Sequence, residues 1–345
     1  MRSQKNDSPT EKLRILVCTG RGWYSSSFVD MFERNGCVVR LLEYTSDNVL
    51  KLERKNPLSR IRPWLALRKA NRRVLDETEN FRPDLVFVVN GEQLFRETVQ
   101  KIAARTKIAH WAVDGVRNLR THPSNLRDYP LSYVFEPTDA QLIPNARFLS
   151  LGADERFYFP RKEPKLFDVS FVGSPHPDRM EFLERVARAS AGKFGFALFG
   201  PFSKISRERF PATCACVRKS ARLNHEEIAD IYRKSKIVLN PHHSQSKIGV
   251  NPRVFEVAAC GTFQLCSNQA ALPQFFPRGE IAVYDDDEIE KIEYFLAHDD
   301  ERERRAAEAC SVALRKNTFA ARARDILRDA FPQDIPGGNA AAAAQ

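Results

Sequence analysis

The sequence predicts an α/β protein built from two Rossmann-like, doubly wound domains that face each other across a cleft. Three observations indicate this fold class. Short, continuous apolar runs alternate with amphipathic segments, this alternation occurs twice, and the chain of 345 residues is long enough for two domains. Continuous apolar runs are typical of parallel strands that helices cover on both faces.

The first domain is expected over residues 12–151. Its strands are short apolar runs, and segments of helical periodicity lie between them. The expected strands are 13–18, 38–42, 84–90, 107–113, 132–136 and 146–151. The expected helices are 23–35, 60–79, 92–105 and 138–143.

A second domain is expected over 166–315, after a polar linker that contains proline at 152–165. Asn224 and Glu227 have the spacing of a capping box and mark one helix start. A helix within 316–333 is expected to pack back on the first domain, and 334–345 to be a disordered tail. The expected strands are 167–173, 194–200, 236–240, 262–266 and 281–284, and the expected helices are 178–191, 225–235, 251–260 and 286–331.

Composition limits the partners and the compartment. The net charge of +10, from 54 Lys and Arg against 44 Asp and Glu, favours anionic partners, unless the charges are simply spread over solvated surfaces. Seven scattered cysteines, an odd number, indicate a reduced protein without a structural metal. The sequence has neither a membrane-spanning apolar stretch nor a signal peptide, so a cytoplasmic location is expected.

The most informative stretch is 251–261, which is expected to be a helix capped by Asn251. Arg253 and Glu256 are its only charged residues, and their spacing places them on one face. Buried charges are costly unless they are satisfied. Either the two form a structural ion pair, or Glu256 accepts ribose hydroxyls while Arg253 or the helix N-terminus meets phosphate. We favour the second reading because ligands of doubly wound sheets bind beyond strand ends.

The same stretch resembles a known family. Residues 251–265 match the N-x-R-x-F-E-x-x-A-x-G-x-x-x-L signature of the CgeB-like (spore-maturation-protein-like) glycosyltransferases. The resemblance implies a GT-B glycosyltransferase of hexosyltransferase type that uses a nucleotide-diphosphate sugar, with UDP the commonest carrier, and that needs no bound metal. It also covers 81–89, 110–115, 148–160, 168–179, 236–242, 275–309 and 317–322, and so nearly the whole chain.

The resemblance assigns the donor nucleotide to residues of the second domain. Glu256 would bind the ribose, and Gly173 and Ser174 would form a turn beside the diphosphate. Arg179 would add positive charge there, unless it is an ordinary solvated helix residue, and Asn240 would either line the cleft or cap a loop. Gly200 would let the backbone approach the base. The donor-site residues implied are Gly173, Ser174, Arg179, Gly200, Asn240, Asn251, Arg253 and Glu256.

Two departures from related retaining enzymes leave the stereochemical outcome open. Those enzymes carry a second glutamate eight positions before the ribose-binding one, where this chain has Ile248. Members of the family commonly have histidine where this chain has Asn317.

The first domain offers weaker candidates. Gly20 and Gly22 follow the first strand and would lie near the donor phosphates, or they are only turn residues, since Ser25 interrupts the G-x-G-x-x-G spacing. Asp114 ends a strand and is a candidate general base for an acceptor hydroxyl, or a loop cap. Glu92 is a second candidate at a neighbouring strand end.

Two charged segments have competing readings. The acidic run 285–288 looks like a metal-binding D-x-D motif, but it directly precedes a helix, where acidic residues favour the N-terminal dipole. Residues 51–73 hold nine Lys or Arg against one Glu, among Leu, Ile and Trp. They form either a solvated helix or a helix that lies on an anionic membrane, which would suit a lipid-linked acceptor. We find no nucleic-acid-binding module.

The expected function is transfer of a sugar from a nucleotide-diphosphate sugar to a hydroxyl acceptor, in the synthesis of a glycan, a lipid-linked sugar or a small-molecule glycoside. Two alternatives stay open. One is an epimerase or hydrolase of sugar nucleotides with the same fold. The other is a non-catalytic binding protein that uses the basic surface.

Overall fold

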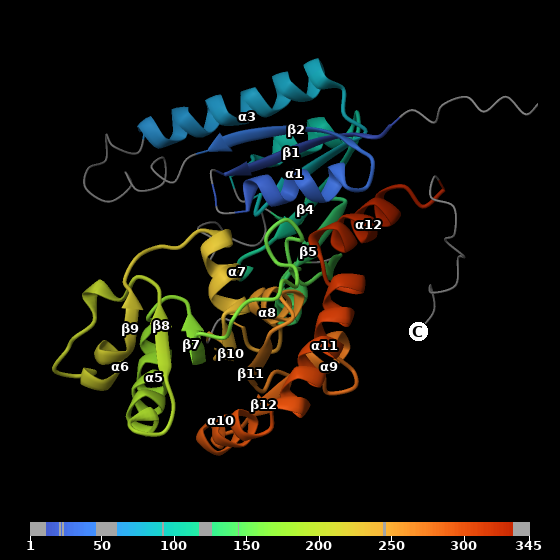
Figure 1. Cartoon of the computed structure of the whole chain (residues 1–345). Helices are drawn as coiled ribbons and strands as arrows, with labels where there is room; N and C mark the ends of the chain where they lie inside the picture. Colours follow the sequence, from blue (N-terminus) through green and yellow to red (C-terminus); the bar gives the residue numbers. More distant parts are fainter. Residues whose placement is uncertain are drawn as a thin grey trace, which may run out of the picture. The chain divides into compact units, whose positions relative to one another are not determined.

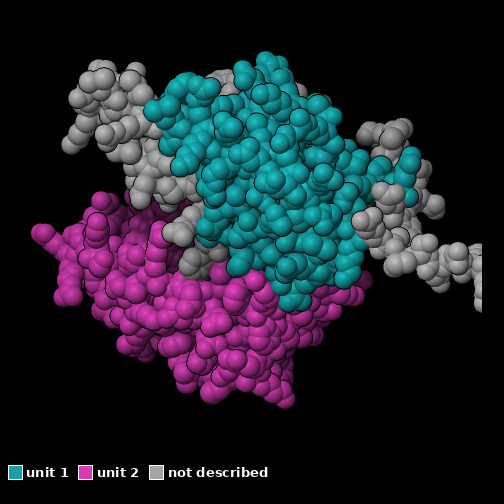
Figure 2. All heavy atoms as spheres, turned by 90° about the horizontal axis from the view of Figure 1, so that it is seen from above, with its two compact units in different colours: residues 1–135, 139–149, 322–345 teal, residues 136–138, 150–321 magenta. Residues whose placement is uncertain are grey.

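A computed structural model describes residues 12–20, 22, 24–45, 61–91, 93–116, 126–143, 145–243 and 246–333 (Figure 1). The chain forms two compact units (Figure 2). The first unit comprises Met1–Phe135, Asp139–Leu149 and Arg322–Gln345, and the second comprises Glu136–Thr138 and Ser150–Ala321. The chain therefore enters the second unit twice.

The first unit holds a six-stranded parallel sheet in the order β2-β1-β3-β4-β5-β6. The strand order reverses between β1 and β3, so the carboxyl ends of these two strands form the switch point of the sheet. The strands are β1 (Arg14–Gly20), β2 (Val38–Thr45), β3 (Leu85–Val89), β4 (Lys107–Ala112), β5 (Leu131–Val134) and β6 (Ala146–Phe148). The helices of this half are α1 (Ser25–Glu33), α3 (Ile61–Phe81), α4 (Arg96–Ala103) and a 3-10 turn at Pro137–Gln141.

The second unit holds another six-stranded parallel sheet, in the order β12-β11-β10-β7-β8-β9. Its order reverses between β7 and β10. The strands are β7 (Phe167–Val172), β8 (Phe196–Phe199), β9 (Val217–Lys219), β10 (Ser235–Asn240), β11 (Phe263–Ser267) and β12 (Ala282–Tyr284). The helices are α5 (Pro177–Ser190), α6 (Pro211–Cys216), α7 (His225–Arg233), α8 (Arg253–Ala259), α9 (Leu272–Phe275), α10 (Glu288–Ala297) and α11 (Asp299–Lys316), with a 3-10 turn at Phe202–Lys204. Helix α12 (Phe319–Ala330) begins in this unit and belongs to the first unit from Arg322 onward.

Both faces of the second sheet are covered, which explains why its strands are apolar without alternation. Successive residues of a strand point to opposite faces. In β10, Ile237 and Leu239 pack in one buried cluster, and Val238 packs in another. A strand between two apolar layers needs an apolar residue at every position, as the sequence pattern predicted.

The expected fold class is confirmed, with local corrections. The capping box is present, because Asn224 Oδ1 accepts from Glu227 N at 2.9 Å and the Glu227 carboxylate accepts from Asn224 N at 2.8 Å. The predicted cap of α8 is wrong: Pro252 is the N-cap residue, and the Asn251 side chain bonds to Asn240 instead. The helical stretch predicted over 286–331 consists of the three helices α10, α11 and α12, and α6 and β9 were not predicted.

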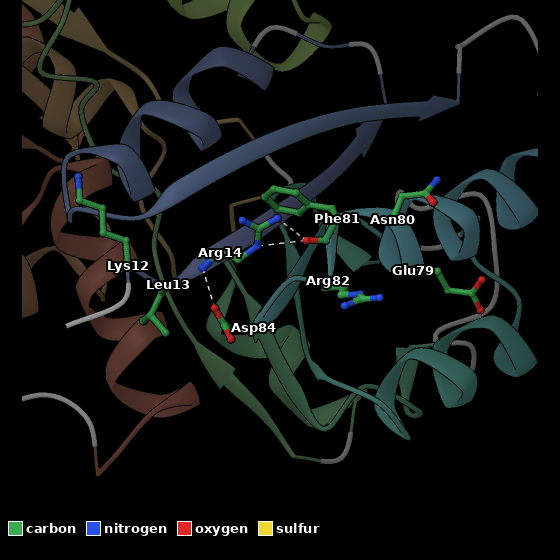
Figure 3. Close-up of a pocket in the computed structure, with 8 residues that line it drawn as sticks. All are labelled: Lys12, Leu13, Arg14, Glu79, Asn80, Phe81, Arg82 and Asp84. Atoms are coloured by element: carbon green, nitrogen blue, oxygen red, sulfur yellow. Dashed lines mark hydrogen bonds between the residues drawn. The ribbon is translucent and has the colours of Figure 1, made fainter. Parts of the chain in front are cut away.

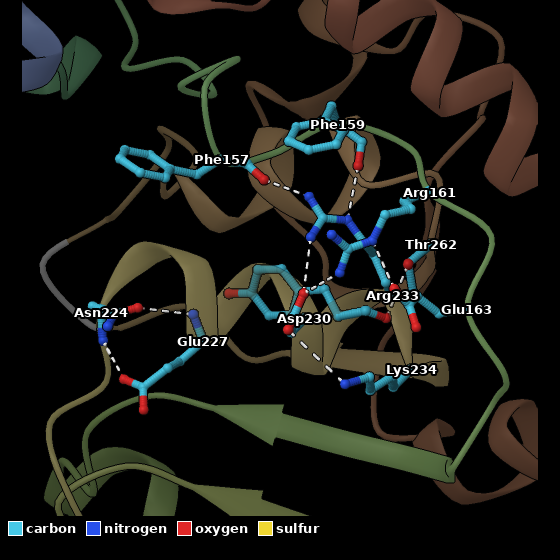
Figure 4. A network of polar contacts seen from close by, with 11 residues as sticks. Phe157, Phe159, Arg161, Glu163, Asn224, Glu227, Asp230, Arg233, Lys234 and Thr262 are labelled. Atoms are coloured by element: carbon cyan, nitrogen blue, oxygen red, sulfur yellow. Dashed lines mark hydrogen bonds and ion pairs between the residues drawn. The ribbon is translucent and has the colours of Figure 1, made fainter.

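The segment expected to be a linker, 152–165, is attached to α7 through one buried arginine (Figure 4). Arg233 is 3% exposed, and it donates to the carbonyl oxygens of Phe157 and Phe159. It also donates to Asp230 Oδ1 at 3.1 Å, and Arg161 binds the same oxygen from the surface at 2.8 Å. Two hydrogen bonds from one buried guanidinium thus hold this segment against α7, and the bond to Asp230 fixes the guanidinium itself.

Candidate functional site

The best candidate site lies at the switch point of the second sheet. β7 and β10 are parallel neighbours, and their carboxyl ends meet there. Gly173 and Ser174 directly follow β7, and Asn240 ends β10. Ligands of open α/β sheets bind beyond the carboxyl ends of strands where the strand order reverses.

Two glycines allow a close approach of backbone at this point. Gly200, which follows β8, has φ of 145°, and a Cβ atom there would lie 2.1 Å from the carbonyl oxygen of Gly173. A Cβ atom on Gly173 would lie 2.7 Å from Nη2 of Arg253. A side chain at 200 would therefore collide with backbone, so this position requires glycine, whereas a side chain at 173 would displace the guanidinium of Arg253.

Arg253, at the start of α8, is held by neutral amide groups. Its Nη1 donates to Asn240 Oδ1 at 3.1 Å, and its guanidinium lies over the ring of Phe171, 5.4 Å from the centroid. Asn240 in turn bonds to Asn251, whose Nδ2 lies 2.9 Å from the same Oδ1, and to Gln264. The network fixes the position of the guanidinium but does not neutralise its charge.

Arg179 adds a second positive charge from the first turn of α5. It is 6% exposed, and its Nε has no hydrogen-bond partner. Burial, together with the charge of Arg253, lowers the pKa of Arg179 to about 10. No carboxylate in the described part of the chain lies within ion-pair distance of Arg179. Buried charges of this kind are stable only with a counter-ion, and the N-terminal dipole of α5 adds to the attraction for an anion.

Three histidines, which the sequence analysis did not select, follow the same two strands. His176 precedes α5, and its ring lies 4.3 Å from that of His243. His242 Nδ1 lies 3.0 Å from Ser267 Oγ, while its Nε2 is buried and has no partner. Burial and the charges of Arg253 and Arg179 lower the pKa of His242 to about 3, so the ring is neutral. The signal was present in the sequence, as a Pro-His pair shortly after each strand.

Glu256 lies one turn along α8 from Arg253 and is 6% exposed. Burial raises the pKa of Tyr232, and the negative charge of Glu256 raises it further, which places this carboxylate near the Tyr232 hydroxyl. The expected role of Glu256 toward a ribose stays a prediction.

A second buried glutamate was not selected from the sequence. Glu136 is buried in the second unit, and its carboxylate accepts from the backbone N–H of Ile248 at 3.2 Å and of Gly249 at 3.1 Å. Ile248 occupies the position where related enzymes carry their second glutamate. Glu136 thus fixes the loop that leads into α8. Its only sequence signal was an acidic residue at the end of an apolar run.

In the first unit, the candidate residues occupy strand ends and turns. Asp114 is exposed, and its Oδ2 accepts from Asn90 Nδ2 at 3.0 Å. The Ser25 hydroxyl bonds to the carbonyl oxygens of Gly20 and Gly22, so these glycines form a closed turn before α1. Their catalytic or phosphate-binding roles stay predictions. Glu92 lies outside the described residues.

The buried His110 of β4 has a structural role. Its Nδ1 lies 2.9 Å from Ser132 Oγ, and its Nε2 lies 2.9 Å from the carbonyl oxygen of Asn90. Burial lowers the pKa of His110 to about 4, so the ring is neutral. Both ring nitrogens are engaged, which leaves none for a substrate.

The acidic run 285–288 belongs to the start of α10. Asp287 is the N-cap residue, without a side-chain capping bond, and its carboxylate accepts from Asp285 N and pairs with Lys291. Glu288 is buried and pairs with Arg185. Over the described ranges, no group of three His, Cys, Asp or Glu side chains is arranged to hold a metal ion.

The basic stretch 51–73 is described only from residue 61 onward, and there it forms the first half of α3. Trp64 and Leu65 are 49% and 53% exposed, and Arg68 lies over the Trp64 ring. Lys69, Arg72 and Arg73 are also exposed. Of the helices that the structure describes, none is long and apolar enough to cross a membrane.

A hollow of about 650 Å³ in the first unit lies at the wrong end of the sheet for a ligand site of this fold (Figure 3). It surrounds the start of β1, where Arg14 donates to the carbonyl oxygen of Phe81 and its backbone N–H donates to Asp84. Arg14 and Arg40 both lie over the Phe81 ring, 4.4 Å from its centroid. These contacts tie strand β1 to the end of α3, and we assign the hollow no function.

A protein-family model described as Glycosyl transferase-like matches residues 179–328. No curated protein sequence matches the chain. Solved structures match almost all of it. Sucrose-phosphate synthase from Thermosynechococcus elongatus has a TM-score of 0.64 at 11% identity, covering 93% of this chain and 100% of that one.

Two further structures hold nucleotides. The Anabaena protein HepE in complex with UDP has a TM-score of 0.62 at 12% identity, covering 92% of this chain and 99% of its own. A trehalose-6-phosphate structure from E. coli, bound with UDP-2-fluoro glucose, has a TM-score of 0.61 at 11% identity, covering 92% and 98%. The fold is GT-B. Identities this low speak for the fold, while the family match describes 179–328 as glycosyltransferase-like.

Proposed function

We propose that this GT-B protein is a glycosyltransferase whose second unit binds a nucleotide-diphosphate sugar at the carboxyl ends of β7 and β10. The observation that carries the proposal is the pair Arg179 and Arg253, two positive charges at the switch point that form no ion pair with a carboxylate among the described residues. A diphosphate supplies the missing negative charge. The glycines at 173 and 200 keep the adjacent backbone clear of side chains.

The proposed chemistry follows from the same charges. When a sugar leaves its nucleotide, negative charge develops on the diphosphate, and preorganised cations and helix N-termini lower the energy of that state. Arg179, Arg253 and the start of α5 would do this without a metal ion. Asp114 would accept the proton of the acceptor hydroxyl, with Glu92 as the second candidate. Glu256 would hold the ribose.

The finer assignments belong to this proposal too. We infer a hexosyl donor carried by UDP, because two GT-B structures of similar fold hold UDP or a UDP-sugar. The narrower CgeB-like membership and a cytoplasmic location rest on the sequence resemblance and composition. A glycan, a lipid-linked sugar or a small-molecule glycoside remains the proposed product.

We further propose that α3 contacts an anionic membrane surface, which would bring a lipid-linked acceptor within reach. Amphipathic helices bind such surfaces by inserting aromatic and aliphatic side chains while Lys and Arg meet the headgroups. The exposed Trp64 and Leu65, with the neighbouring Arg68, Lys69 and Arg72, provide both groups on one helix.

A thermal-shift panel with UDP, GDP, TDP, ADP and CMP tests the donor site. One nucleoside diphosphate is expected to stabilise the wild type, since a ligand that binds only the folded state adds about 2.7 kcal/mol at a hundred times its Kd. Glu256→Ala is expected to lose most of the shift, and Glu256→Gln part of it. A folded wild type that none of the five stabilises would refute the proposal.

Product analysis separates the enzymatic readings. A transferase forms a glycoside only when an acceptor is present, whereas a hydrolase releases free sugar and an epimerase converts the sugar nucleotide without either. A non-catalytic binder gives no product and instead binds polyanions in a salt-sensitive manner.

A further inference from the structure

His242 occupies an unusual position at the end of β10. Its backbone N–H donates to Ser267 Oγ at 3.0 Å, and its Nδ1 lies 3.0 Å from the same oxygen. One side of the imidazole is therefore fixed by β11, while Nε2, on the other side, is buried and has no partner among the described residues.

The contacts of Ser267 determine which ring nitrogen carries the hydrogen. A serine hydroxyl accepts two hydrogen bonds and donates one. The backbone N–H of His242 donates to Ser267 Oγ, so the Ser267 hydroxyl still has its own hydrogen to donate to Nδ1. The single ring hydrogen then lies on Nε2. In the reverse arrangement Nδ1–H donates to Ser267, whose hydroxyl hydrogen then needs another acceptor.

An Nε2–H group without an acceptor is costly when buried, unless a ligand supplies one. The ring is close enough to Arg253 and Arg179 for both charges to lower its pKa. Within the described ranges, neither arginine forms an ion pair with a carboxylate, and His242 Nε2 has no partner. A phosphate group supplies the anion for both arginines and the acceptor for the histidine. Because the imidazole is neutral, it adds a hydrogen bond without adding a third positive charge beside the two arginines.

We propose that His242 donates a hydrogen bond from Nε2–H to an oxygen of the donor diphosphate, beside the oxygens bound by Arg179 and Arg253. Ser267 is a positioning residue that holds the imidazole in this tautomer. The inference rests on the proposed function and names a further residue of the same site.

Titration calorimetry with the active nucleoside diphosphate, its monophosphate and the free nucleoside tests the contact. His242→Phe is expected to bind the diphosphate roughly ten- to a hundredfold more weakly, the usual effect of losing a hydrogen bond to a charged group. The nucleoside is expected to bind unchanged. His242→Gln, which retains an N–H donor at similar reach, is expected to recover part of the loss. His298→Gln, outside the site, is the matched control.

Nitrogen-15 NMR of the imidazole tests the tautomer directly. The imidazole signals of His242 are identified as those missing from the spectrum of the His242→Gln variant. In the wild type they are expected to show a neutral ring with hydrogen on Nε2 between pH 6 and 8, and to shift when the nucleoside diphosphate is added. Ser267→Ala is expected to raise the fraction of the other tautomer. A purely structural histidine would show no nucleotide-dependent shift.

The outcomes separate this inference from the proposed function. If the wild type binds a nucleoside diphosphate and His242→Phe binds it equally well, the role of His242 is wrong and the donor site stands. Hydrogen on Nδ1 would overturn the inference in the same way. If no nucleoside diphosphate binds the wild type, both proposals fall together.

Discussion

Two buried arginines in the second unit are expected to respond in opposite directions to the same substitution. Arg179 is 6% exposed and has an unpartnered Nε, whereas Arg233 is 3% exposed and donates to two carbonyl oxygens and to Asp230. Methionine is a flexible apolar residue that fits irregular spaces. Arg179→Met is expected to stabilise the protein, and Arg233→Met to destabilise it.

The magnitudes follow from the contacts. The pKa of Arg179 is lowered to about 10, well below the ordinary value of arginine in water, and one pKa unit corresponds to about 1.4 kcal/mol. The charged native state is thus disfavoured by up to about 3 kcal/mol at every pH below 10, and this penalty fades as pH rises from about 10 toward the ordinary pKa of arginine. Arg179→Met should therefore raise the free energy of unfolding by about 1 to 3 kcal/mol at pH 7.

Arg233→Met should lower the free energy of unfolding by about 3 to 5 kcal/mol, because it leaves buried acceptors without donors. Arg161→Met is the surface control. Arg161 shares the Asp230 carboxylate but is half exposed, so its loss is expected to cost about 1 kcal/mol or less.

Urea unfolding at pH 7, followed by circular dichroism, measures all three variants. The same samples, titrated with the active nucleoside diphosphate, should show that Arg179→Met gains stability but loses about tenfold or more in affinity. If Arg179→Met destabilised the protein as much as Arg233→Met does, the charge of Arg179 would have a protein partner. The case for an anion at this site would then fail.

Three further predictions concern a glycine, the candidate base and the basic helix. Gly200→Ala is expected to lower the free energy of unfolding by about 2 kcal/mol or more in urea titrations, since its Cβ would collide with the Gly173 carbonyl. Asp114→Asn is expected to lower kcat by about a hundredfold or more in a transfer assay while the donor KM is unchanged. Replacing Arg68, Lys69 and Arg72 by Gln is expected to weaken binding to phosphatidylglycerol vesicles by about a hundredfold, at roughly 1 kcal/mol per charge.

Each of these has a control that isolates its cause. Gly192 also has a positive φ, 73°, but a Cβ atom there would meet nothing within 4 Å. Gly192→Ala therefore measures the cost of the backbone strain without a collision. An Asp114→Asn variant with full kcat would exclude Asp114 as the base. In the vesicle assay, the control variant has Gln at three exposed cations of α11 and so loses the same charge as the α3 variant. If both variants lost vesicle affinity equally, only the net charge of the protein would matter. The control positions are Arg304, Arg315 and Lys316.

The arrangement of the fold could be predicted from local pattern. Buried parallel strands need apolar residues at every position, so runs such as 84–90 and 236–240 identified them, and the bounds shifted by only a few residues. Gly173, Arg179, Asn240 and Arg253 meet because each lies at or just beyond a carboxyl strand end of one sheet. That rule is topological, and the order of elements in the sequence already contains it.

The rest depends on contacts that local pattern does not contain. The carboxylate of Glu136 binds an amide 112 residues away, and no spacing rule predicts such a pair. Asn251 has the residue type of a helix cap, yet its side chain hydrogen-bonds to the side-chain amide of Asn240 instead of capping α8. The role of His242 was missed because the burial of its Nε2 atom, which has no partner among the described residues, becomes visible only when β10 and β11 lie side by side.

The path of the chain has a practical consequence for dissecting the molecule. A fragment that begins at Ser150 would contain every helix and strand of the second sheet, yet it would lack Glu136, the acceptor for the N–H groups of Ile248 and Gly249. We therefore expect that, in a fragment of residues 150–321, the loop 246–250 is less ordered and the first turn of α8 is less stable. A fragment meant to contain the whole second unit should begin no later than residue 136. Alternatively, a peptide that contains Glu136–Thr138 should be added to the shorter fragment.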